Sequence, residues 1–201
     1  MERWMTRFAI GAMALVAAAC ASTTMKDSWV DTTVRAAPFA KVLVVAGGTD
    51  VTQQRILEDV MAEKLRSVGV EGLQGYRFLP DGRASEEQMN GAVTRSGADG
   101  LMLVRSRGVR TETEVRTTTM PGPMGPGWYG WYGSWYGVPD IYQYRIATIE
   151  TSVFDASTKK LVWTGVTETF DPASFRRDAG RLADIIVGAL ASNKLTPKGV
   201  S

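Results

Sequence analysis

The chain has 201 residues, with one cysteine, no histidine and a formal net charge of +2 at pH 7. The absence of histidine excludes the Ser-His-Asp and Cys-His catalytic arrangements and nearly all zinc sites. Without the N-terminal signal described next, the chain is close to neutral, which argues against a nucleic-acid partner. We therefore expect a protein that is not an enzyme, with no cofactor and no bound metal.

Residues 1–19 predict an export signal. Arg3 and Arg7 provide a positive n-region, and the apolar run 8–19 is too short to span a hydrocarbon core of ~30 Å as a helix. The small residues 17–19 directly precede Cys20. This ending resembles the lipobox of bacterial lipoprotein precursors, in which the cysteine after a small residue becomes diacylated.

The lipobox match has one departure and one alternative. Ala17 stands where leucine is preferred, and an Ala-x-Ala site for ordinary signal peptidase fits the same alanines. Acylation explains a lone cysteine in an oxidising compartment, so we predict that the mature chain begins at Cys20 and is held on a membrane by its acyl chains. In lipoproteins of this kind, aspartate after the cysteine favours inner-membrane retention. Ala21 at that position implies the outer membrane, with the domain facing the periplasm.

Residues 20–38 are polar and without a sustained period, which predicts a lipidated N-terminus and a flexible tether. Docking of Trp29 and Val34 on the domain is the alternative for this segment. The domain itself is predicted over 39–196, followed by a short tail at 197–201.

A β-α-β-α-β alternation fills the first half of the domain. The apolar run 41–47 is typical of a strand buried on both faces, and the apolar residues of the following segment repeat with the period of a helix. Capping residues mark where both helices begin. The predicted elements are a strand at 41–47, a helix begun by Asp50 and Gln53, a weaker strand at 70–79 with an edge position as one interpretation, a helix begun by Ser85 and Gln88, and a strand at 99–110.

The second half predicts a hairpin and a final helix. Alternating segments 142–155 and 159–170 flank a short turn, and Trp163 belongs to the core by its place in the hairpin. Pro172 is suited to the first position of a helix that reaches residue 194. Its apolar stripe consists of Phe175, Ala179, Leu182, Ile186, Ala189 and Leu190. The fold class is thus α/β (α+β), a single domain with a mixed sheet of about five strands and helices packed against it.

A Gly/Pro/aromatic loop is predicted at 120–140, between two strands. Its centre reads GWYGWYGSWYG, and glycine at this density gives the aromatic rings no regular helix or strand from which to pack. Tyrosine and tryptophan suit a half-wet boundary, so we predict an exposed contact loop; folding back over the sheet and plain disorder are the alternatives. The candidate contact residues are Trp128, Tyr129, Trp131, Tyr132, Trp135 and Tyr136.

Other candidate sites are weaker. Arg105, Arg107 and Arg110 gather at the end of a predicted strand, as an exposed strand end or as a basic patch for an acidic partner. Residues 157–160 satisfy the S-x-x-K pattern of serine-lysine enzymes, but they fall in a hairpin turn and the companion motifs are missing. Gly47-Gly48 predicts a tight turn before a helix rather than a phosphate site, since the G-x-G-x-x-G pattern is absent.

Four segments carry a family resemblance: AKVLVVAGGTD, ILEDVMAEKL, ADGLMLVR and ETSVFDASTKKLVWTGVTET. With them, residues 20–196 resemble a family of uncharacterised Gram-negative outer-membrane lipoproteins with a domain of unknown function. More distantly, the layout is similar to the periplasmic α/β domains of the curli-secretion lipoprotein, the penicillin-binding-protein activator and the Tol protein. The resemblance implies a non-enzymatic envelope interaction or assembly module with an envelope protein as partner. The alternative is a small-ligand or glycan-binding lipoprotein that uses the aromatic loop.

Overall fold

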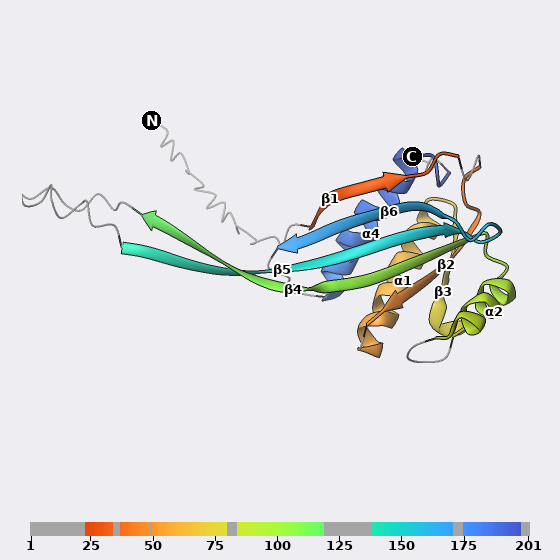
Figure 1. Ribbon diagram of the computed structural model, residues 1–201, viewed down its shortest axis with the longest axis horizontal. Helices are drawn as coiled ribbons and strands as arrows, with labels where there is room; N and C mark the ends of the chain where they lie inside the picture. Colours follow the sequence, from red (N-terminus) through yellow and green to blue (C-terminus); the bar gives the residue numbers. More distant parts are fainter. Residues whose placement is uncertain are drawn as a thin grey trace, which may run out of the picture.

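The computed structural model describes residues 23–33, 37–48, 50–79, 84–118, 138–170 and 175–197. They form one mixed sheet of six strands, in the order β1-β6-β5-β4-β2-β3, with helices packed on it (Figure 1). The predicted single α/β domain is confirmed, with six strands instead of about five. The elements are β1 (Thr23–Val30), β2 (Lys41–Gly47), α1 (Val51–Ser67), β3 (Glu71–Gln74), η1 (Gly75–Arg77), α2 (Glu86–Ser96), β4 (Gly100–Thr118), β5 (Val138–Asp155), β6 (Leu161–Phe170) and α4 (Phe175–Ser192).

The strands β4, β2 and β3 are parallel neighbours. Parallel strands need crossover connections, and α1 and α2 provide them. The Asp50 side chain accepts a hydrogen bond from the Gln53 backbone N–H at the start of α1, and Ser85 and Gln88 form a full capping box at the start of α2. The predicted helix starts are therefore confirmed.

Helices lie on both faces of the sheet, over separate apolar clusters. The larger cluster fills the space under α1 and α4, and the smaller one lies under α2, because alternate residues of a strand point to opposite faces. Trp163 is fully buried in the larger cluster, as predicted. Phe175 departs from the predicted stripe: it is 39% exposed, as the first residue of α4. The other core side chains include Val42, Val44, Met61, Leu65, Met102, Val153, Leu182, Ile186 and Leu190.

Residues 23–30 are a strand and not part of a flexible tether. β1 pairs antiparallel with β6, from Thr23 opposite Thr169 to Val30 opposite Trp163, and the register shifts between Met25 and Asp27. This bulge breaks the alternation of apolar and polar residues by which a strand is recognised in a sequence. Pairing with β6 also covers a sheet edge that would otherwise be open. Val34 lies outside the described residues.

Several predicted boundaries were wrong. The segment 70–79 is a strand only as far as Gln74 and continues as the 3-10 helix η1. The strand predicted at 99–110 extends to Thr118, and its partner β5 begins at Val138, inside the predicted loop. The described part of α4 begins at Phe175, so the predicted role of Pro172 lies outside the described residues.

Candidate functional site

The two longest strands extend beyond the body of the domain as an arm. β6 pairs with β5 only as far as Ile146 opposite Phe170, and β2 pairs with β4 only as far as Arg105. β4 and β5 nevertheless stay paired for eight further residues each, from Thr111 opposite Arg145 to Thr118 opposite Val138. We call these two stretches the arm; Figure 1 shows it projecting from one end of the sheet.

Neither outer edge of the arm has a strand partner within the described part of the chain. A ribbon of two strands is marginally stable on its own, and a row of unpaired backbone N–H and C=O groups is a template for pairing with another chain. The arm therefore has the properties of a contact element. The predicted contact residues, from Trp128 to Tyr136, belong to the segment between the two strands of the arm, and this segment lies outside the described residues. Cys20 also lies outside the described residues.

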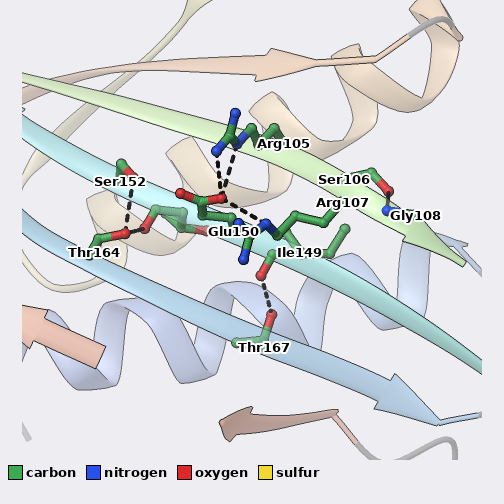
Figure 2. A network of polar contacts seen from close by, with 10 residues as sticks. Arg105, Ser106, Arg107, Gly108, Ile149, Glu150, Ser152, Thr164 and Thr167 are labelled. Carbon is green, nitrogen blue, oxygen red and sulfur yellow. Dashed lines mark hydrogen bonds and ion pairs between the residues drawn. The ribbon is translucent and has the colours of Figure 1, made fainter. Parts of the chain in front are cut away.

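On the side of the sheet opposite α1 and α4, the apolar cluster under α2 includes residues of β2, β3 and the start of β4, within the part of the chain that the structure describes. We call the remainder of this side, over β1, β6, β5 and β4 from Arg105 onward, the open face; Figure 2 views it with helices behind the strands. All three arginines of the predicted patch lie here, in the interior of a long strand rather than at its end. By register, the open face includes Thr24, Lys26, Asp27, Trp29, Arg105, Arg107, Arg110, Glu112, Ile146, Thr148, Glu150, Ser152, Thr164, Val166, Glu168 and Phe170. Ile146, at the root of the arm, is buried on this face, at 1% exposure.

A β-bulge brings two of the arginines to one carboxylate. The register of β4 against β5 shifts between Ser106 and Gly108, whose φ of 129° favours glycine. As a result Arg105 Nη2 lies 2.8 Å and Arg107 Nε 3.2 Å from the same oxygen of Glu150 (Figure 2).

The third arginine joins a second cluster. Arg110 Nε lies 2.8 Å from Glu112 Oε1, and Arg110 Nη1 lies 2.8 Å from Glu168 Oε1. Lys26 Nζ, in the β1 bulge, lies 3.3 Å from Glu168 Oε2. The hydrogen bond from Arg110, and then the one from Lys26, hold the pKa of Glu168 below its ordinary value of 4.5. Each arginine of the predicted patch thus has a carboxylate partner, and the four cations of these clusters face three carboxylates.

A separate cleft of about 480 Å³ lies where β2 ends, between the first turn of α1 and η1. Its lining includes Gly47, Gly48, Arg55, Tyr76 and Arg105. Crevices at the carboxyl ends of parallel strands are where open α/β sheets bind ligands. Gly47 ends β2 and Gly48 follows it at this edge of the cleft, while Thr49 of the predicted tight turn lies outside the described residues.

Glu58 is a buried carboxylate at the base of this cleft that our sequence analysis did not single out. It is 4% exposed, and burial raises its pKa. One oxygen accepts a hydrogen bond from the Ala46 N–H and the other from the Tyr76 N–H, both at 2.9 Å. The carboxylate therefore ties the end of β2 to η1. The signal was present in the sequence, since Glu58 falls on the buried stripe of α1, between Leu57 and Met61.

The S-x-x-K pattern is a polar turn. The hydroxyl groups of Ser157 and Thr158 both donate to Asp155, at 2.6 and 3.0 Å, and Lys159 has a positive φ of 58°. The described residues contain no group of three or more histidine, cysteine or acidic side chains that could hold a metal ion. They also include no helix long and apolar enough to cross a membrane.

Comparison with known proteins gave structural likenesses alone. No family model matches the chain, and no curated protein matches it. The chain is similar to the PelC dodecamer from Paraburkholderia phytofirmans at 14% identity and a TM-score of 0.47, covering 88% of this chain and 99% of that one. It is also similar to lipoprotein GNA1162 from Neisseria meningitidis at 15% identity and a TM-score of 0.40, covering 76% and 99%.

Proposed function

We propose that the protein is a non-enzymatic interaction or assembly module of the cell envelope. It is anchored in the outer membrane by acyl chains on Cys20, and its domain faces the periplasm. The observation that carries the proposal is the arm, a two-stranded ribbon that no third strand of the described residues joins. The lipobox-like sequence before Cys20 supports the anchor.

The chemistry of the described residues supports a role without catalysis. The carboxylate with the raised pKa, Glu58, has both oxygens occupied by backbone hydrogen bonds, and the arginines of the open face are held by glutamates. Glu58 and Arg105 also line the cleft, but their hydrogen bonds and ion pairs join neighbouring strands and η1. We therefore propose a structural role for these groups and not a catalytic one.

The partner we propose is an envelope protein. Unpaired strand edges suit recognition by strand addition, in which backbone hydrogen bonds supply affinity. The aromatic residues that the sequence places between the strands of the arm, among them Trp128, Trp131 and Trp135, are of the types that dominate protein contact sites.

The cleft supports a second candidate, a small-ligand-binding lipoprotein. Its volume of about 480 Å³ falls within the ~300–1,000 Å³ of small-molecule sites. A glycan held by the Trp/Tyr loop belongs to the same class of function. A ligand in the cleft would protect Arg55 and Tyr76 from solvent and leave the arm unchanged, which separates the two candidates.

The test combines a mass measurement with crosslinking. Mass spectrometry of the mature protein is expected to find a diacylated or triacylated Cys20 at its N-terminus. Replacing Trp128, Trp131 and Trp135 together by alanine is expected to leave the melting temperature unchanged and to remove crosslinked envelope partners. The control Phe175→Ala changes an exposed aromatic residue outside the arm and the open face. A large fall in melting temperature for the triple variant would mean that these rings are core, and the proposal fails.

A further inference from the structure

The predicted lipid anchor and the arm leave the sheet at the same end. β1 begins at Thr23, which lies opposite Thr169 near the end of β6. The next residue of β6, Phe170, is opposite Ile146, which is in turn opposite Arg110, at the root of the arm. Figure 1 shows the start of β1 and the arm on one side of the body.

The arm reaches farther than the anchor. Cys20 precedes Thr23 by three residues, so it lies within ~11 Å of the start of β1 even with the chain fully extended. The arm continues the sheet by eight residues, or ~26 Å at the rise of a strand. If both ran along the strand axis, the arm would pass the acylated residue by more than ~10 Å.

This difference in reach excludes an upright domain. With the strands perpendicular to the membrane and Cys20 at its surface, the outer half of the arm would enter the hydrocarbon region. Unpaired sheet edges do not occur in contact with lipid chains, and the arm sequence contains Glu114, Arg116 and Asp140, whose burial there is costly. The strands must therefore tilt away from the membrane normal.

The two faces of the sheet differ in how close they can bring the arm to the lipid. A helix layer is ~10 Å thick, so resting on α1 and α4 would lift the arm away from the surface. On the other side of the sheet the only described helix, α2, lies at the end away from the arm (Figure 1), so no described helix covers β1, β6 and β5 next to the arm. The open face there exposes Trp29 by 51% and the side chains of Arg107 and Lys26 by 54% and 49%. Tryptophan and long cationic side chains are suited to the headgroup region.

We propose that the open face and the arm lie on the headgroup layer of the membrane that holds Cys20. The inference rests on the acylation in the proposed function and adds the surface through which the domain meets lipid. The four cations of the ion pairs on this face meet three carboxylates, among them Glu150 and Glu168, which leaves little net charge there. Contact with lipid therefore depends little on anionic lipid or on salt.

Spin labels on single introduced cysteines test this placement. The acylated protein is reconstituted into vesicles of phosphatidylethanolamine and phosphatidylglycerol, after mass spectrometry confirms that Cys20 is modified. Glu112→Cys and Arg107→Cys report from the open face. Val109→Cys, which is 60% exposed on the other side of β4, and Glu63→Cys on α1 are the controls.

Labels at residues 107 and 112 are expected to collide severalfold more with lipid-soluble oxygen than with a water-soluble nickel chelate, at low and at high salt. Labels at 109 and 63 are expected to show the reverse. Equal accessibility at 112 and 63 in acylated, vesicle-bound protein would overturn the inference and leave the proposed function standing. Spin–spin broadening at 112 without a preference for oxygen would overturn it in favour of pairing with a second copy. An unmodified Cys20 would overturn the proposed function as well.

Discussion

The two faces of the sheet are built from the same strands but differ in the side chains they carry and in the roles of these side chains. Under α1 and α4, the strands contribute fully buried apolar side chains such as Met102, Val153 and Trp163. On the open face, the same strands contribute arginines, glutamates and hydroxyl groups that pair with one another, as in the Ser152–Thr164 hydrogen bond of 3.0 Å. One face supplies the stability of the fold, and the other leaves a polar surface and an arm available for contact.

The largest expected effect tests the helix-covered face. Leu182 of α4 is 4% exposed, so Leu182→Ala removes buried methyl groups and leaves a cavity, with an expected loss of ~2–5 kcal/mol in the free energy of unfolding. The matched change Val109→Ala, at a 60% exposed residue near the root of the arm, is expected to cost below ~0.5 kcal/mol. Urea denaturation measures both. Equal losses would mean that the two regions share one core.

Much of the helix-covered half could be predicted because its signals are local. Asp50 and Ser85 cap helices at the expected positions, and Leu182 and Ile186 fall on the buried stripe of α4. The strands β1 and the outer half of β4 could not be predicted in the same way. β1 is stabilised by pairing with β6, far away in sequence, and the bulges at Lys26 and Arg107 shift the side-chain alternation by one residue.

The sequence predicted which arginines gather on the sheet, but it did not predict which carboxylates pair with them. The sequence gathers Arg105, Arg107 and Arg110 within six positions, but their carboxylates come from other strands: Glu150 from β5 and Glu168 from β6. Register decides which side chains meet across strands, and a single sequence does not specify register at a bulge. An apparent basic patch thus becomes a set of ion pairs.

A smaller effect is expected from the open face. Glu168 itself is 7% exposed, but its partners Arg110 and Lys26 each have side chains that are 49% exposed. Solvent therefore screens these pairs, and Glu168→Gln is expected to cost about 1 kcal/mol at pH 7. Because the folded protein holds the pKa of Glu168 below 4.5, the contribution is present above that pH and is lost as the pH falls below it. The difference in unfolding free energy between the native protein and the variant, followed by urea denaturation from pH 7 to pH 3, should therefore shrink on acidification. A constant or growing difference would contradict the role of these pairs.

The smallest expected effect on stability comes from removing the whole arm. Arg110 and Ile146 lie directly opposite each other, so an Asn-Gly turn between them closes a hairpin of suitable geometry and removes residues 111–145. The strands of the deleted arm pair only with each other among the described residues, and the deletion also removes the exposed Arg110–Glu112 ion pair between the arm and the body. Calorimetry is therefore expected to show a melting temperature within a few degrees of that of the native protein, a change below ~1 kcal/mol in unfolding free energy. The shortened protein should keep the core and lose the contacts that the arm makes. A fall as large as that of Leu182→Ala would show that the arm packs on the domain, and the separation between a stabilising face and a contact surface would fail.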